Sequence, residues 1–307
     1  MGNTGIVEAP GALSAPEPAR RRWRTGRRVS AVAAVALAGL VGGLLLVDDK
    51  EEPVAANAVT GGVGTAEVSV ADLQKVARTR VFFGHQSVGN NILDGVPAVF
   101  SAAGVQPPSI EQRRDAPGGS GGFIVHSLIG ENTKPLGKIK DFDAVLRGGL
   151  AQHVDVAVMK LCYVDITPST DVDALFTAYR DTIAALEKDF PDVTFIKATV
   201  PLTTKPTNVE RLKLWLKDND GYGAAANATR ERLNELIRKE YQGKHLFDVA
   251  AVESTASDGS RVSGRHEDQP YFALADGYAA DPGHLNADGS RRVATAWLTA
   301  VANASSK

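Results

Sequence analysis

From residue 81 onward, short apolar runs alternate with longer amphipathic stretches, and this order leaves few folds open to the chain. The apolar runs are continuous rather than alternating, which predicts strands covered on both faces. In the stretches between them, apolar residues recur every three or four positions, as in helices that bury one side. Strands and helices in alternation predict one α/β domain with a parallel sheet between helical layers. The predicted strands are residues 81–84, 154–161, 193–200 and 246–249, and the predicted helices are 172–189, 224–241 and about 288–303.

An uncharged run at residues 29–47 precedes this region. As a helix it would span roughly 28 Å, close to the thickness of the hydrocarbon core of a bilayer. Arginines lie before the run and acidic residues directly after it, an order typical of a cytoplasmic N-terminus and a translocated C-terminal part. We therefore predict a transmembrane helix or signal anchor, followed by an extracytoplasmic domain. The alternative is a signal peptide that is cleaved near the Ala56-Asn57-Ala58 triplet, which would give a secreted protein.

The charge of the chain divides between these regions. The formal net charge is −2, but residues 1–28 carry +4 and the remainder carries −6. Excess negative charge on the folded part argues against a nucleic-acid partner, because such proteins bind phosphates through basic side chains. The predicted organisation is a disordered basic segment at 1–28, the transmembrane helix at 29–47, a linker at 48–66 and one domain at 67–307. The sequence does not indicate an oligomeric state.

Cys162 is the only cysteine of the chain, which excludes an intramolecular disulfide and a cysteine-rich metal cage. We interpret it as a buried apolar residue rather than a nucleophile. A metal site could combine Asp281 and His284 with His85 or His126. The histidines lack the close spacing that is typical of zinc ligands, so we predict no metal and no other cofactor.

The first predicted strand ends at Gly84 and is followed closely by Ser87. A serine on a tight turn between a buried strand and a helix can be a nucleophile. It can equally be an N-cap that accepts a hydrogen bond from a helix amide. Taken alone, the position of Ser87 favours the N-cap interpretation over the nucleophile.

A second motif, Asp281-Pro282-Gly283-His284, precedes the last predicted helix. Proline and glycine at its second and third positions predict a type II turn, which brings the first and fourth residues together. Asp281 could then orient His284 and stabilise its protonated form, and Ser87 would complete a catalytic triad. The alternative is an aspartate that caps the turn beside a surface histidine.

Together the two motifs resemble those of the SGNH (GDSL-type) hydrolases. Gly84-x-x-Ser87 stands after the first strand, and Asp281-x-x-His284 stands before the terminal helix. The resemblance spans about residues 78–302 and implies a flavodoxin-like three-layer α/β/α domain that hydrolyses or transfers acyl groups. By residue, it implies Ser87 as nucleophile, His284 as general base and then acid, and Asp281 as its orienting partner.

The sequence departs from this family in two places. The family motif has Gly-Asp-Ser, whereas His85 and Gln86 separate Gly84 from Ser87 here. The family also places an oxyanion-binding Asn after its third strand, and Val164 stands at that position. A lost oxyanion donor costs roughly 10²–10³ in turnover, so a replacement is needed. We predict that Gly130 and Asn132 supply it, with Asn90 or Asn91 as an alternative.

Two further features offer other readings. Gly118-Gly119-Ser120-Gly121-Gly122 matches the G-x-S-x-G motif of α/β-hydrolases, but no strand precedes it. We interpret it as a flexible loop that could form a lid beside the site. Lys160 follows a predicted strand and could bind an anionic group, although an ion pair with Asp165 or another acid is the favoured reading.

Two hypotheses for function follow. The first is a membrane-tethered extracytoplasmic serine esterase, acyl hydrolase or acyl transferase that acts on a small-molecule, glycan or lipid ester. The second is a catalytically inactive module with the same fold, which binds envelope glycan or a protein partner; the missing family Asn motivates it.

Overall fold

The computed structural model describes residues 68–206 and 221–305. The predicted N-terminal segment, transmembrane helix and linker (1–28, 29–47 and 48–66) lie outside the described residues. Within the two described ranges, no helix is both long enough and apolar enough to cross a bilayer. The membrane segment stays a prediction, and the structure concerns the predicted α/β domain.

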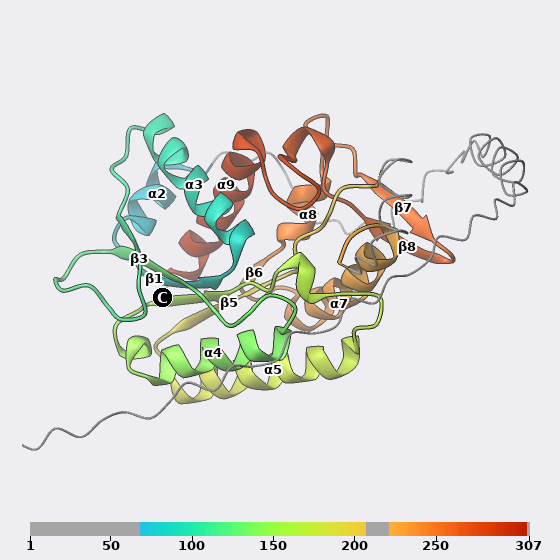
Figure 1. The fold of residues 1–307 in the computed structure, drawn as a ribbon. Helices are drawn as coiled ribbons and strands as arrows, with labels where there is room; N and C mark the ends of the chain where they lie inside the picture. The colour runs from blue at the N-terminus through green and yellow to red at the C-terminus, as the bar shows by residue number, and fades with distance from the viewer. Residues whose placement is uncertain (1–67, 207–220, 306–307) are drawn as a thin grey trace, which may run out of the picture. The chain divides into compact units, whose positions relative to one another are not determined.

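Six parallel strands form the central sheet, in the order β2-β3-β1-β4-β5-β6 (Figure 1). If the edge strand β2 is left out, this is the flavodoxin-like order, in which the first strand lies between the second and the third. The prediction of an α/β fold with a parallel sheet is confirmed. The strands are β1 (Arg80–His85), β2 (Ser109–Gln112), β3 (Phe123–Leu128), β4 (Val156–Met159), β5 (Thr194–Ala198) and β6 (Leu246–Phe247).

Helices cover both faces of this sheet (Figure 1). Alternate residues of β1 show the two cores: Phe83 packs on Trp297 of α9 (5.3 Å between ring centroids), and Phe82 stacks on Phe142 of α4 (5.5 Å). The domain is therefore a three-layer α/β/α sandwich. One layer contains α2 (Val70–Val76), α3 (Ser87–Ala102), α8 (Val249–Ser254) and α9 (Ala287–Ala304), and the other contains α4 (Pro135–Arg147), α5 (Val172–Asp189) and α7 (Ala224–Tyr241).

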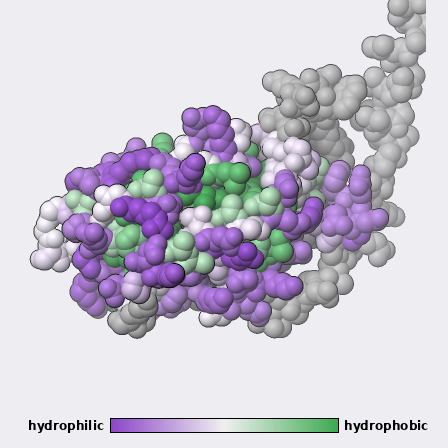
Figure 2. Space-filling view, turned by 90° about the horizontal axis from the view of Figure 1, so that it is seen from below, coloured by the Kyte–Doolittle hydropathy of each residue, from purple (hydrophilic) through white to green (hydrophobic). Residues whose placement is uncertain are grey.

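The outer face of the α4–α5 layer is mainly hydrophilic, with smaller hydrophobic areas between the polar side chains (Figure 2). This agrees with the amphipathic pattern of α5, which buries Leu175, Tyr179, Ile183 and Leu186 against the sheet. The bounds of α5 and α7 are those predicted, and α9 is one residue longer at each end.

The sheet has two strands more than the four predicted. β3 falls within the apolar stretch 123–129, whereas β2 has the polar, partly exposed sequence SIEQ at the sheet edge. An edge strand lacks a neighbour on one side, so its sequence need not carry the apolar run of a central strand. A separate antiparallel pair, β7 (Ser263–His266) and β8 (Gln269–Phe272), was also not predicted.

The chain leaves β1 toward β3 on one side and later returns to β4 on the other side. The C-terminal end of β1 therefore lies at the topological switch point, where open α/β sheets bind their ligands. Ser87 follows this end of β1 by two residues.

Candidate active site

Ser87 is the first residue of α3, and the N-cap is Gln86 in an extended conformation. The reading of Ser87 as the helix cap is therefore wrong. The Gln86 side chain does not cap the helix either; its Nε2 donates to the carbonyls of Ile129 (2.8 Å) and Gly130 (3.1 Å). These bonds connect the turn that carries Ser87 to the loop after β3.

His284 connects Ser87 to Asp281. The Ser87 Oγ lies 2.9 Å from Nε2 of His284, and Nδ1 lies 2.8 Å from Oδ2 of Asp281. A carboxylate can only accept, so Nδ1 carries the ring proton and Nε2 accepts from the serine hydroxyl. The structure thus brings these three predicted residues into one chain of hydrogen bonds, with the order that a nucleophile, a base and an orienting acid require.

The Asp281 carboxylate is stabilised in its charged form. Its Oδ1 also accepts from the main-chain amides of Gly283 and His284, each at 2.9 Å. Partial burial acts to raise the pKa of Asp281, but the Gly283 amide and the His284 imidazole outweigh it, and the pKa lies below its usual value. The side chains of His284 and Asp281 retain 33% and 51% of their exposure, so the pair faces solvent.

The segment around His284 is anchored on both sides. The Asn91 Oδ1, on α3, accepts from the Leu285 amide at 3.3 Å. The Asn286 Oδ1 accepts from Gly289 at 2.9 Å and caps α9. Asn91, predicted as an alternative oxyanion donor, therefore uses its side-chain oxygen to hold α3 against the histidine segment.

The turn at Asp281 differs from the one predicted. A type II turn needs a positive φ at Gly283, and Gly283 is not among the glycines with positive φ. Glycine is required there for another reason: a Cβ would overlap the ring of Tyr163. The same ring packs edge-on against His284, at 5.7 Å between centroids. The sequence reasoning missed Tyr163, and the only signal for it is its position just after the second predicted strand, 154–161.

We expect Gly283→Ala to destabilise the domain by about 1–3 kcal/mol, because the added methyl group must displace Tyr163 or the turn. Urea unfolding of the full-length chain in detergent measures this free energy. Gly277→Ala is the matched control, since a Cβ there meets no atom within 4 Å. Equal stability of the two variants would contradict the close packing of Tyr163 on Gly283.

Of the predicted oxyanion donors, Gly130 already has a partner. Its amide donates to Oδ2 of Asp141 at 2.8 Å, so the donor that the prediction needed is occupied. Asn132 is exposed in the same loop, and its Oδ1 accepts from Nζ of Lys138 at 2.8 Å. The side-chain NH₂ of Asn132 is then left to donate to another group.

The ion pair predicted between Lys160 and Asp165 is not formed. Asp165 pairs with Lys138 at 2.7 Å, and both side chains are fully buried. Lys160 is also buried, and its Nζ donates to the Leu161 carbonyl at 3.3 Å. The signal for Lys138 was present in the sequence, because it shares the apolar face of α4 with Phe142 and Val145.

His85 and His126 pair with each other. The His85 Nδ1 donates to the Gln86 carbonyl (2.8 Å), so its Nε2 accepts from Nδ1 of His126 (2.9 Å). Burial, together with the charge of Lys160, lowers the pKa of His85 to about 3 despite the bond to Gln86. In residues 68–206 and 221–305, no three His, Cys, Asp or Glu side chains form a group that could hold a metal.

A buried neutral histidine makes the domain sensitive to acid. The unfolded state takes up the His85 proton below pH 6.5, whereas the folded state resists it down to about 3. His85 should therefore contribute a loss of about 1.4 kcal/mol of stability per pH unit as the pH drops through this window. We expect His85→Gln to reduce the slope measured by urea unfolding at a series of pH values by about this amount, while carboxylates with lowered pKa, such as Asp248 and Asp281, keep their own contributions. The exposed His153→Gln is the control, and an unchanged slope in His85→Gln would contradict the prediction.

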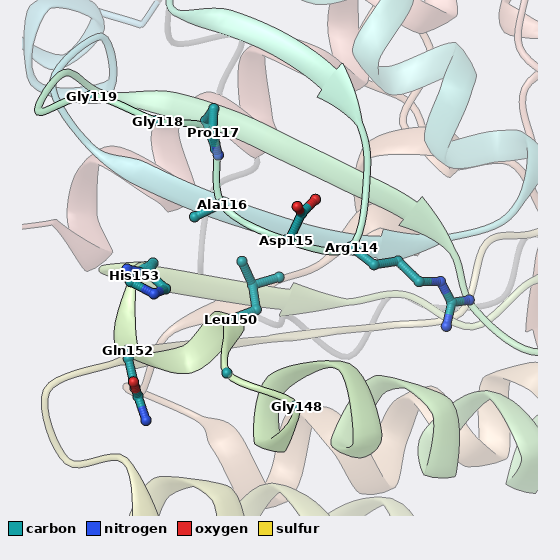
Figure 3. Close-up of a pocket in the computed structure, with 11 residues that line it drawn as sticks. Arg114, Asp115, Ala116, Pro117, Gly118, Gly119, Gly148, Leu150, Gln152 and His153 are labelled. Carbon is teal, nitrogen blue, oxygen red and sulfur yellow. The ribbon is translucent and has the colours of Figure 1, made fainter.

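None of the predicted site residues lines the cavity of about 550 Å³ that Figure 3 shows. It lies between the loop that leads into β3 and the segment Gly148–His153 that leads into β4, and Gly118 and Gly119 line it. Gly122 packs on the main chain of Arg78, just before β1. The glycine loop thus reaches the N-terminal ends of the strands, and its interpretation as a lid beside Ser87 is wrong.

Comparison with known proteins finds solved structures at low sequence identity. No protein-family model and no curated protein matches this chain. Among solved structures, a candidate acylhydrolase from Bacteroides fragilis is 13% identical, with a TM-score of 0.45 over 76% of this chain and 98% of its own. A candidate SGNH hydrolase from Slackia heliotrinireducens is 14% identical, with a TM-score of 0.40 over 73% and 98%. A family 3 carbohydrate esterase from Clostridium thermocellum is 12% identical, with a TM-score of 0.39 over 73% and 98%.

Proposed function

We propose that this chain is a serine esterase or acyl transferase with Ser87 as its nucleophile. The observation that carries the proposal is the hydrogen bond of 2.9 Å between Ser87 Oγ and His284 Nε2, with Asp281 on the other ring nitrogen. Ser87 and His284 are 197 residues apart, and each stands where the fold presents a side chain at the C-terminal end of the sheet.

In the proposed reaction, Ser87 Oγ attacks the carbonyl carbon of an ester while its proton passes to Nε2 of His284. The resulting imidazolium is stabilised by Asp281, which already holds Nδ1. When the bond to the leaving alcohol breaks, His284 returns the proton to the alcohol oxygen. Water, or the hydroxyl of an acceptor, then attacks the acyl-serine by the same route and restores Ser87.

The oxyanion requires donors from groups other than Val164. Ser87 stands at the first position of a 16-residue helix, where the amides lack partners within the helix and the helix dipole favours negative charge. We assign the Ser87 and Val88 amides as one part of the oxyanion site. We assign the NH₂ group of Asn132 as the other part, in place of the family Asn.

The location and the substrate class are also proposed. The run at 29–47 and the charges on either side of it support a single-pass anchor with the domain outside the cytoplasm. Such a position gives access to envelope glycans, lipids and secreted esters. A triad that faces solvent would accept an ester carried on a larger molecule.

A fluorophosphonate probe tests the proposal directly, since it reacts only with an activated serine. We expect the full-length chain in detergent to be labelled at Ser87, as located by peptide mass spectrometry, and to hydrolyse short p-nitrophenyl esters. An unlabelled, inactive chain would instead support the second hypothesis, an inactive module that binds a glycan or a protein.

A further inference from the structure

A buried polar feature that the proposed mechanism does not use is the ion pair between Lys138 of α4 and Asp165. The Lys138 Nζ lies 2.7 Å from Oδ2 and 2.8 Å from Oδ1 of Asp165, and both side chains have no exposure. The third donor of the ammonium group goes to Oδ1 of Asn132, at 2.8 Å. All three protons of Lys138 therefore have acceptors.

Asp165 joins two loops at the C-terminal edge of the sheet. Its Oδ1 accepts from the Thr133 amide (2.9 Å), in the loop after β3. Its Oδ2 accepts from the Cys162 amide (2.7 Å), in the loop after β4. The first of these loops is also bound by Gln86, directly before Ser87. The pair thus lies beneath a loop that adjoins the nucleophile turn.

The loop is held in a backbone conformation that it would not adopt freely. Thr133 has a φ of 69°, in the left-handed region. A β-branched residue in the left-handed region costs about 1–3 kcal/mol and persists only where its surroundings fix it. At Thr133 the fixing contact is the hydrogen bond to Asp165.

Stability alone is a weak reason for such a pair. Apolar side chains of similar volume commonly replace a buried ion pair without loss of stability, because desolvation offsets the attraction between the charges. An apolar pair, however, could hold neither the Thr133 amide nor the Asn132 oxygen. The feature that needs charges here is the fixed position of Asn132.

We propose that Lys138 and Asp165 are positioning residues that aim the NH₂ group of Asn132 at the oxyanion. Lys138 holds Oδ1 of the amide, so the NH₂ on the opposite branch points away from the buried pair and toward the exposed side of the loop. The proposal rests on the proposed esterase function. It explains how a donor in the loop after β3 could take the place of the family's oxyanion-binding Asn, whose position Val164 occupies here.

The test is a mutant cycle on the full-length chain in detergent, with kcat and KM measured on a p-nitrophenyl ester. We expect Asn132→Ala to lower kcat about 10²-fold with KM nearly unchanged, the effect of a lost oxyanion donor. K138M/D165L should cause a similar fall when it is assayed below its melting temperature, which should itself drop because the Thr133 and Cys162 amides lose their acceptor. In that background, Asn132→Ala should cost nothing more, because the donor is already misplaced.

A purely structural pair would give another pattern. If K138M/D165L, assayed below its melting temperature, keeps its kcat within about twofold, or if Asn132→Ala costs the same in both backgrounds, the proposal is wrong. If K138M/D165L does not fold, K138M/D165N keeps an oxygen for the Thr133 amide and takes its place in the cycle. Replacing the Lys197–Glu187 pair by Met and Leu is the control, and kcat should not change.

The cycle also separates this proposal from the proposed function. Labelling of Ser87 by a fluorophosphonate tests the function without any change at Lys138, Asp165 or Asn132. If the chain is labelled and active but its kcat is unchanged by substitution of Lys138, Asp165 and Asn132, the positioning role alone is overturned. A chain without Ser87-dependent hydrolysis would overturn both.

Discussion

Ser87→Ala should lower kcat for ester hydrolysis by about 10⁴- to 10⁶-fold, and His284→Ala by a similar factor. The size follows from the way a triad works: the hydroxyl is a weak nucleophile until the imidazole takes its proton, so the loss of either partner removes the same step. The hydrogen bond of 2.9 Å between them is already formed without substrate. KM should change little, because neither side chain is assigned to ground-state binding.

The combination of the two changes is the more discriminating measurement. Residues that act as a unit are far from additive, so the double variant should be no slower than the worse of the single variants. Ser101→Ala, on the exposed last turn of α3, and the exposed His153→Ala are the controls. Activity that survives in Ser87→Ala, or single effects that multiply in the double variant, would contradict a shared proton-transfer step.

The parts of the site that could be predicted from the sequence are those set by local geometry and by fold class. Asp281 and His284 lie within one turn, so their contact needs no knowledge of the rest of the chain. Their contact with Ser87 follows only if the strands are parallel, since parallel strands bring their C-terminal ends to one edge of the sheet. The continuous apolar runs predicted parallel strands, and the central sheet of the structure is parallel.

The contacts that could not be predicted are those between buried side chains that lie far apart in the sequence. Lys160 and Lys138 are both buried lysines near Asp165 in sequence or in space, but only Lys138 reaches it. Which lysine pairs with Asp165 depends on the packing of α4 against the loop after β4. A local sequence pattern carries no information about that packing. The reason for Gly283 is of the same kind: the ring that excludes a Cβ belongs to Tyr163, on a distant loop.

The loops show the same limit. Gly130 has the small size and the position expected of an oxyanion donor, but Asp141, from α4, occupies its amide. The glycine-rich stretch at 118–122 has the composition of a mobile loop near a site, yet it leads back to the opposite edge of the sheet because β2 and β3 are parallel. Composition can identify a loop, but the strand topology decides at which edge of the sheet the loop lies.

Asp281→Asn should lower kcat about 10²- to 10⁴-fold while the fold is kept. The asparagine oxygen can still accept from the amides of Gly283 and His284, so the turn should remain. Its NH₂ cannot accept from Nδ1, so the ring proton is free to move to Nε2, where it would face Ser87 and prevent proton transfer. Because Asp281 is about half exposed, water can partly replace it, and the loss should be smaller than that of Ser87→Ala.

The measurement is kcat on a p-nitrophenyl ester, together with the rate of fluorophosphonate labelling, which should fall by the same factor because both depend on serine activation. Asp276→Asn, an exposed carboxylate five residues earlier, is the matched control and should leave both rates unchanged. A fall in both rates with an unchanged melting temperature assigns Asp281 to the orientation and charge of His284. Full activity in Asp281→Asn would mean that Tyr163 and the main chain orient the imidazole without the carboxylate, and the triad would reduce to a Ser87–His284 dyad.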